Sequence, residues 1–196
     1  MKIFSQYKGL RRENYILFIG RIVTNLGAMV WPVLTLILSQ KLGMNAKNVA
    51  LVSIGSEILL LPIGLLGGKL ADKYNKKRII VVCDLISIVF YFICAAIPLS
   101  FVTVALMVVG AGCQSMEYPA YNALIADMTC TADRERAYSL QYLGANIGLV
   151  ASPTIAGLLF ADYLWLSFLL SGAAIGISTL LIALRVRNIE PVHEES

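Results

Sequence analysis

Long apolar segments separated by short polar ones dominate the pattern along the chain. Each apolar segment is about 20–25 residues long, which is the length that an α-helix needs to cross a hydrocarbon core of about 30 Å. The pattern predicts an all-α membrane protein with six transmembrane helices, over residues 14–38, 48–69, 78–98, 102–126, 137–160 and 163–185. We assign residues 1–187 to one six-span bundle, and residues 188–196 to a polar cytoplasmic tail or the start of a central linker.

Glycines recur four residues apart within three of these segments. Lipid provides no hydrophobic drive for helix association, so close backbone approach through small residues matters more in a membrane. We therefore expect helix contacts at three glycine pairs: Gly64 with Gly68, Gly144 with Gly148, and Gly172 with Gly176.

The composition agrees with a membrane protein. Hydrophobic residues make up 58% of the chain and charged residues 14%, and the mean hydropathy is +0.76. A soluble domain usually carries about a quarter charged residues. The net charge of +4 does not indicate a nucleic-acid partner, because the basic residues gather at the ends of the apolar segments. The four cysteines lack metal-ligand spacing, so we expect neither a metal nor a cofactor.

Basic residues are distributed unevenly between the two ends of the predicted helices. With the N-terminus inside, thirteen lie on the cytoplasmic side, whereas only Lys41 and Lys47 lie outside and Arg21 falls within the membrane. An excess of Lys and Arg in short loops marks the cytoplasmic side. We therefore expect a multi-pass protein of the cell membrane with both termini in the cytoplasm. The thirteen are Lys2, Lys8, Arg11, Arg12, Lys69, Lys73, Lys76, Lys77, Arg78, Arg134, Arg136, Arg185 and Arg187.

Four charged side chains fall inside the predicted helices, where a charge is costly and needs a partner or a purpose. They are Arg21, Glu57, Asp84 and Glu117. Asp84 lies about two turns into its helix, where its carboxylate can pair with Arg78, another loop base or Arg21. No basic residue is predicted at the depth of Glu57, which is therefore either a proton site or a hydrogen-bonding group between helices.

Glu117 shares a stretch of its helix with polar and aromatic residues, Gln114, Tyr118 and Tyr121. Polar groups beside aromatic rings suit an amphipathic or cationic ligand, through charge and cation–π contact. We therefore favour a ligand or proton site over a structural ion pair at Glu117. The predicted substrate or proton site contains Arg21, Asn25, Glu57, Gln114, Glu117 and Tyr121.

The loop between the second and third predicted helices carries five basic residues and one acid, Asp72. Residues 68–80 read GKLADKYNKKRII, which resembles the loop 2–3 signature of the major facilitator superfamily. Asn75 stands where the family usually has Gly, and Asn tolerates positive φ, so the same turn remains possible. In the family this Asp pairs with loop bases and with a helix start in a second bundle, and so latches the outward-facing state. The resemblance implies a conformational latch built from Gly68, Asp72, Lys73, Lys76, Lys77, Arg78, Asp127 and Arg134.

The fourth and fifth predicted helices extend the resemblance. Their connection, over residues 119–137, looks like that of the family's drug exporters. The fifth helix resembles the family's antiporter motif at Gly148, Ser152, Pro153, Ala156 and Gly157, with Ser and Ala in place of two glycines. Exporters often carry an Arg four residues before a Gly in the fourth span, where this chain has Leu106 before Gly110. Arg21 is the candidate to take its place in proton coupling.

The resemblance implies one bundle of a major facilitator fold, built from two inverted triplets of helices. It covers the whole chain but only the first half of a complete transporter. It implies proton-coupled efflux of amphipathic or drug-like compounds, as in multidrug resistance, with a second six-helix bundle as partner. The alternative is a non-transporting membrane subunit, or a truncated half-transporter, that binds a partner. An enzyme is not expected, because the sequence has no His-based metal motif, no Ser-His-Asp set and no Gly-rich phosphate loop.

Overall fold

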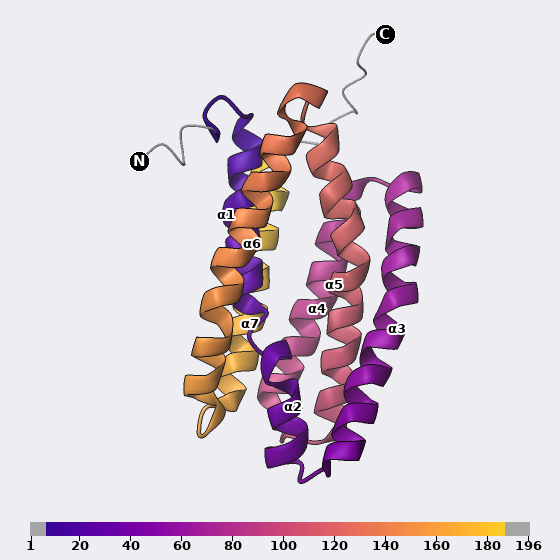
Figure 1. Ribbon diagram of the computed structural model, residues 1–196, viewed down its shortest axis with the longest axis vertical. Coiled ribbons are helices and arrows are strands. Elements are labelled where there is room, and N and C mark those ends of the chain that lie inside the picture. Colours follow the sequence, from indigo (N-terminus) through magenta and orange to yellow (C-terminus); the bar gives the residue numbers. More distant parts are fainter. Residues whose placement is uncertain (1–6, 187–196) are drawn as a thin grey trace.

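The computed structural model describes residues 7–186, which fold into a bundle of long helices without a strand among them (Figure 1). Six of its helical segments are long and apolar enough to cross a membrane, which confirms the predicted fold class. The predicted tail at residues 188–196, together with Lys2 and Arg187, lies outside the described residues. The elements are α1 (Arg12–Gly27), η2 (Trp31–Val33), α2 (Leu34–Leu36), η3 (Ile37–Lys41), α3 (Ala46–Lys73), α4 (Lys76–Ala96), α5 (Phe101–Asp127), α6 (Thr131–Phe160) and α7 (Leu164–Arg185).

The first span is broken, although the sequence predicted one helix over residues 14–38. Helix α1 ends at Gly27, and the short 3₁₀ turn η2 begins at Trp31 with Pro32 in its first turn. Proline lacks the N–H that would bond to the carbonyl four residues earlier, and its ring clashes there. The span then resumes through α2 and a π-helical turn, so the broken span extends from residue 12 to residue 41.

The helices pack as two related triplets. Helix α4 packs mainly on α5 and α7, α1 packs on α6 and α7, and α3 packs on α5. The first triplet is α1, α3 and α4, and the second is α5, α6 and α7. The contact of α3 with α5 corresponds to the contact of α6 with α1, and the contact of α4 with α5 corresponds to that of α7 with α1. The third helices of the two triplets, α4 and α7, pack on each other. Because α1 and α5 run in opposite directions, the triplets are inverted relative to each other, as in transporter folds built from inverted repeats (Figure 1).

Two glycines bring helices to backbone contact. A Cβ atom at Gly67 of α3 would lie 2.2 Å from the carbonyl oxygen of Met116 on α5. A Cβ atom at Gly148 of α6 would lie 2.6 Å from the carbonyl oxygen of Ile22 on α1. Gly68, by contrast, would meet nothing nearer than 4.0 Å. The expectation of a close contact at Gly68 is therefore wrong, because its neighbour Gly67 faces α5.

Helix α3 is covered on one side only within the described bundle. Of its 28 residues, Ser56, Gly67 and Ala71 alone are buried. In a bilayer such a face meets lipid or further helices. Figure 1 shows α3 at one edge of the bundle, with α6 and α7 at the opposite edge. Its exposed large apolar residues are Leu51, Ile54, Ile58, Leu59, Leu61, Leu65 and Leu66.

Both ends of the described chain lie at the same end of the bundle, at the top of Figure 1. The α3–α4 and α5–α6 links, at residues 74–75 and 128–130, lie there too. We call this the basic end, because it carries nearly all basic side chains of the described residues. Lys41 and Lys47 lie at the other end.

Candidate functional site

A cavity of about 710 Å³ opens between α1, α5 and α6. Each helix presents residues spaced three or four apart, which place its polar side chains on one face. The walls combine amides, phenols, one guanidinium and one carboxyl group with a few apolar side chains. The lining residues are Arg21, Thr24, Asn25, Ala28, Gln114, Glu117, Tyr118, Asn122, Tyr138, Gln141, Tyr142, Ala145, Asn146 and Leu149.

The guanidinium group of Arg21 lies over two rings of α5. Its Cζ atom is 4.8 Å from the ring centroid of Tyr118 and 4.5 Å from that of Tyr121. Tyr121 is itself fixed, because its hydroxyl donates a hydrogen bond to the carbonyl oxygen of Leu17 at 2.7 Å. A cation over an aromatic ring is stabilised by about 2 kcal/mol or more where both are shielded from water. The rings therefore hold Arg21 against α5, at the wall of the cavity.

Glu117 is the acidic member of the lining, and a second carboxyl group lies behind it. Asp84 of α4 is 3% exposed and Glu117 is 6% exposed, and the two carboxyl groups interact electrostatically. Arg21 also interacts with Glu117 through its charge. Thr179 of α7 donates a hydrogen bond to Asp84 Oδ2 at 2.7 Å. A polar cluster thus runs from the cavity through α5 and α4 to α7.

The expected ion pair of Asp84 with Arg78 or Arg21 is wrong. In the described part of the chain, no basic nitrogen lies within 4.0 Å of the Asp84 carboxylate. Arg78 and Asp84 are six positions apart, and at 3.6 residues per turn they fall on different faces of α4. Arg78 is exposed near the basic end, whereas Asp84 points into the bundle.

The structure brings most of the predicted site residues together, but not Glu57. Arg21, Asn25, Gln114 and Glu117 line the cavity, and Tyr121 lies directly behind Arg21. Asn25 Nδ2 donates to the backbone carbonyl of Arg21 at 2.8 Å.

Glu57 is exposed on α3, in a separate pocket of about 380 Å³ with Trp31 and Ser53. Grouping Glu57 with the other site residues was therefore wrong. The position of Glu57 in the sequence indicated its depth in the membrane, but not which side of α3 its side chain occupies. Among the described residues, no group of three His, Cys, Asp or Glu side chains is arranged to hold a metal ion.

Helix α6 supplies a wall of the cavity that the sequence reasoning missed. Tyr138, Gln141, Tyr142 and Asn146 all line it. Gln141 Nε2 donates to the carbonyl oxygen of Asn14 on α1 at 3.0 Å. The spacing of these residues by three and four was the available signal, because it places them on one helix face. The resemblance of this span to the antiporter motif drew attention to its small residues instead.

The motif residues of α6 divide between two sides of the helix. Gly148, Ser152 and Ala156, four residues apart, are buried. Pro153 and Gly157 are exposed, and a Cβ atom at Gly157 would meet nothing within 4 Å. One half of the motif therefore packs within this bundle, and the other half is uncovered among the described residues.

The basic loop is engaged within the bundle through its lysines. Lys76 forms an ion pair with Asp127 at the end of α5, with Nζ and Oδ2 2.7 Å apart. Lys77 Nζ donates to the carbonyl oxygens of Ala183 and Val186, at 2.8 and 2.6 Å. Because carbonyl groups at a helix C-terminus lack partners in the helix, this lysine caps α7.

Asp72 is exposed, and no basic nitrogen among the described residues lies within 4.0 Å of it. The local lysine partners expected for it are therefore not seen. The expectation that Asn75 could adopt positive φ is also wrong, because its φ is −61° and it acts as the N-cap of α4. Its Oδ1 accepts a hydrogen bond from the backbone N–H of Arg78 at 3.1 Å.

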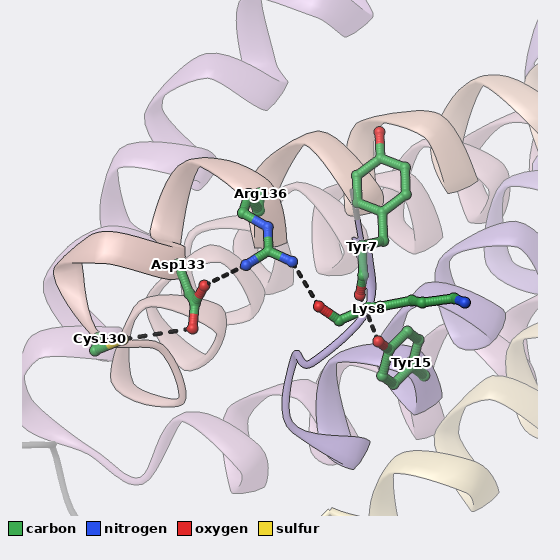
Figure 2. Close-up of polar contacts among 6 residues, drawn as sticks. All are labelled: Tyr7, Lys8, Tyr15, Cys130, Asp133 and Arg136. Atoms are coloured by element: carbon green, nitrogen blue, oxygen red, sulfur yellow. Dashed lines mark hydrogen bonds and ion pairs between the residues drawn. The ribbon is translucent and has the colours of Figure 1, made fainter. Parts of the chain in front are cut away.

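Figure 2 shows how the start of the described chain is fastened to α6 at the basic end. Arg136 joins Asp133 Oδ1 at 2.7 Å and donates to the carbonyl oxygen of Lys8 at 2.6 Å. The hydroxyl of Tyr15 donates to the carbonyl oxygen of Tyr7 (Figure 2). Arg134, which we had expected in the latch, is exposed. The neighbouring Arg136 instead joins the first and second triplets.

Comparison with known proteins gives a family match over most of the chain. A family model described as Major Facilitator Superfamily matches residues 16–196. An uncharacterized MFS-type transporter of Bacillus subtilis is 24% identical over 185 residues, which cover 94% of this chain and 45% of that protein. A Na⁺, Li⁺, K⁺/H⁺ antiporter of Planococcus maritimus is 30% identical over 145 residues, which cover 69% of this chain and 32% of that protein. A class C tetracycline resistance protein of Escherichia coli is 31% identical over 114 residues, with coverage of 58% and 28%.

Solved structures share the fold. A crystal structure of a peptide transporter, POT, in complex with alafosfalin matches with a TM-score of 0.78 and 21% identity, over 92% of this chain and 40% of that one. The same transporter in complex with sulfate matches with a TM-score of 0.78 and 22% identity. The chain therefore spans less than half the length of these relatives.

Proposed function

The chain belongs to the major facilitator superfamily, and from that premise we propose that it is one six-helix half of a proton-coupled exporter of small amphipathic compounds. The observation that carries the proposal is the cavity between α1, α5 and α6. It contains a buried carboxyl group, Glu117, beside a guanidinium group, Arg21, and rings that can stack on a ligand. The antiporter and the resistance protein among the relatives support export coupled to protons.

The lining favours a ligand that is partly aromatic and partly polar. Tyr118, Tyr138 and Tyr142 offer ring faces to flat apolar groups. Asn25 and Asn146 offer amides that both donate and accept hydrogen bonds. A cationic group on the ligand would be attracted to Glu117 and to the tyrosine rings. We therefore expect small amphipathic cations to be transported better than anions.

A second six-helix bundle would complete the site. The exposed apolar face of α3 and the uncovered Pro153 and Gly157 of α6 support a partner that contacts both of these helices. The same uncovered surfaces also favour the alternative function, a membrane subunit that binds a partner without transport. The two functions differ in whether the complex transports a solute in exchange for protons.

The proposed orientation places the basic end in the cytoplasm, because short basic loops are retained there. Export would then begin with a ligand from the cytoplasm or inner leaflet. Both ends of the described chain lie at the basic end, so we place both termini in the cytoplasm.

Transport in proteoliposomes tests the proposal. This chain is reconstituted alone, and also as part of a two-bundle protein, with ethidium as the probe cation. An imposed pH gradient should drive ethidium movement through the two-bundle protein, because protons moving the other way supply the energy. The chain alone should give no flux, because its cavity lacks a second wall. Ethidium binding without gradient-driven flux in the two-bundle protein would favour the subunit.

A further inference from the structure

A pocket of about 380 Å³ lies between the broken first span and α3, apart from the cavity already described. Its polar and aromatic lining consists of Trp31, Thr35, Ser53 and Glu57, and we call it the Glu57 pocket. None of its lining residues also lines the cavity between α1, α5 and α6. Figure 1 shows α2 beside the lower part of α3, in the half of the bundle away from the basic end. The molecule therefore has two separate hollows.

The break in the first span separates the two sites. Ala28, just after α1, lines the cavity, whereas Trp31, at the start of η2, lines the Glu57 pocket. In an unbroken helix, residues three apart would be neighbours on one face. Leu34 and Thr35 follow Trp31 by three and four residues and line the same pocket. The break after Gly27 thus directs two consecutive parts of one span into two different sites.

Glu57 lies near the middle of α3, where a charge inside a membrane needs a partner. It forms neither a hydrogen bond nor an ion pair with any residue between 7 and 186. Arg21 lies over the rings of α5, and Lys41 donates to the carbonyl oxygen of Ala161. Lys47 lies at the start of the same helix, about 15 Å from Glu57 along its axis at 1.5 Å per residue. The described chain therefore leaves this carboxyl group without a counter-charge.

The other lining groups provide an aromatic ring, a hydroxyl and apolar walls. Trp31 is half-buried and packs on the apolar core of this half of the bundle, which holds its ring at the pocket. Ser53 Oγ is buried and has no hydrogen-bond partner among the described residues. A bound group can supply the partner that such a hydroxyl needs. The remaining lining is mainly apolar and includes Leu34, Ile54 and Ile58.

We propose that the Glu57 pocket binds a small amphipathic cation, which is attracted by the carboxylate of Glu57 and the ring of Trp31. Among aromatic side chains, tryptophan attracts a cation most strongly, and aromatic sites of this kind recognise quaternary ammonium groups. Small-molecule sites usually have volumes of about 300–1,000 Å³, with mostly apolar walls and a few polar groups. The volume and the lining of the Glu57 pocket agree with both.

A basic side chain from a second bundle is the rival occupant, because the apolar face of α3 is also uncovered. A single lysine or arginine side chain would fill only part of the pocket and would leave most of its apolar walls without contacts. A ligand with a charged part and an apolar part matches both the carboxylate and the walls. The choice of ligand class rests on the proposed function, but binding at this pocket requires no transport.

Quenching of Trp31 fluorescence tests the site. The chain has two tryptophans, and Trp165 is exposed near the start of α7, so Trp165→Phe leaves Trp31 as the reporter. The protein in phosphatidylcholine vesicles is titrated with a nitroxide that carries a dodecyl chain and a quaternary ammonium group, and with its uncharged amide analogue. Nitroxides quench tryptophan on contact. The cation should quench Trp31 at a concentration lower by about tenfold or more, which is the scale of one shielded cation–π contact.

Glu57→Gln in the same background should lose most of this preference, because the counter-charge is removed while the size is kept. Glu57 is exposed, so the variant loses no packing. Asp162→Asn, at an exposed acid between α6 and α7, is the matched control and should keep the preference. Trp31→Phe, with Trp165 retained, should show none, which excludes simple enrichment of the cation at the membrane surface. Equal quenching of Trp31 by the two probes, or an unchanged preference in Glu57→Gln, would overturn the proposal.

Two comparisons separate the Glu57 pocket from the cavity and from a second bundle. Glu117→Gln alters the cavity and should leave the preference at Trp31 intact, and its loss would place the cation in the cavity instead. In a two-bundle protein, the difference between the forms with and without Trp31→Phe should show the same preference. Its disappearance there would show that the second bundle fills the pocket, and would overturn the proposal. If the preference is found but no transport occurs, the proposed function fails and the site stands.

Discussion

Substitution of Gly67 by Ala should weaken the bundle at the contact between α3 and α5. A Cβ atom there would lie 2.2 Å from the carbonyl oxygen of Met116 and 2.7 Å from its Cα atom, so the helices must move apart. Overpacking of this kind typically costs about 1–3 kcal/mol. Ala also favours a helix over Gly by about 0.8–1.0 kcal/mol, which partly offsets the loss.

Gly68→Ala is the matched control, because it has the same gain in helix propensity and its Cβ atom meets nothing nearer than 4.0 Å. The gain in helix propensity is the same in both variants, so it cancels when their free energies of unfolding are compared. Unfolding of the purified proteins in mixed detergent micelles, followed by circular dichroism, should show Gly67→Ala less stable than Gly68→Ala by about 1–3 kcal/mol. Equal stability of the two variants would refute the close packing of α3 on α5.

The loop and the cavity give further predictions. Glu117→Gln should preserve folding but weaken ethidium binding, because the bound cation loses its counter-charge. Fluorescence titration measures the affinity, and an unchanged affinity would show that Glu117 has a structural role only. Asp127→Asn should lower the free energy of unfolding by about 1 kcal/mol, since the ion pair with Lys76 is partly exposed; an effect independent of salt would contradict an electrostatic cause. Asp72→Asn in a two-bundle transporter should insert normally and lower export, and wild-type export would exclude a latch. Cysteines placed at Asn45 and Asn75 should be labelled from opposite sides of the membrane, and labelling of both from outside would contradict the topology.

Features set by chain length and composition could be predicted from the sequence. The span length that a bilayer requires determined the six helices, and α4, α5 and α7 begin and end within two residues of the predicted positions. The break in the first span was not predicted, because the apolar run continues on both sides of Pro32 and is long enough for one span. Asn75 was expected to resemble the glycine it replaces, whereas its side chain caps α4 instead.

Features that depend on how each helix is rotated could not be predicted. Glu57 and Glu117 looked alike as acids inside spans, but one is exposed on α3 and the other faces the cavity. The partner of Asp84 is Thr179, which lies 95 residues later in the chain. The sequence around Thr179 is apolar and does not indicate that its hydroxyl will contact a carboxyl group. Only the packing of α4 against α7 brings them together.

Proton release on ligand binding directly tests proton coupling at the cavity between α1, α5 and α6. Ethidium is added to the protein in nanodiscs in weakly buffered solution near pH 7, and a pH indicator reports the protons released. We expect protons to appear as ethidium binds, and we expect Glu117→Gln to reduce both binding and release. The control Asp162→Asn, at an exposed acid between α6 and α7, should change neither. Ethidium that binds the wild-type protein without releasing protons would contradict proton coupling at this cavity.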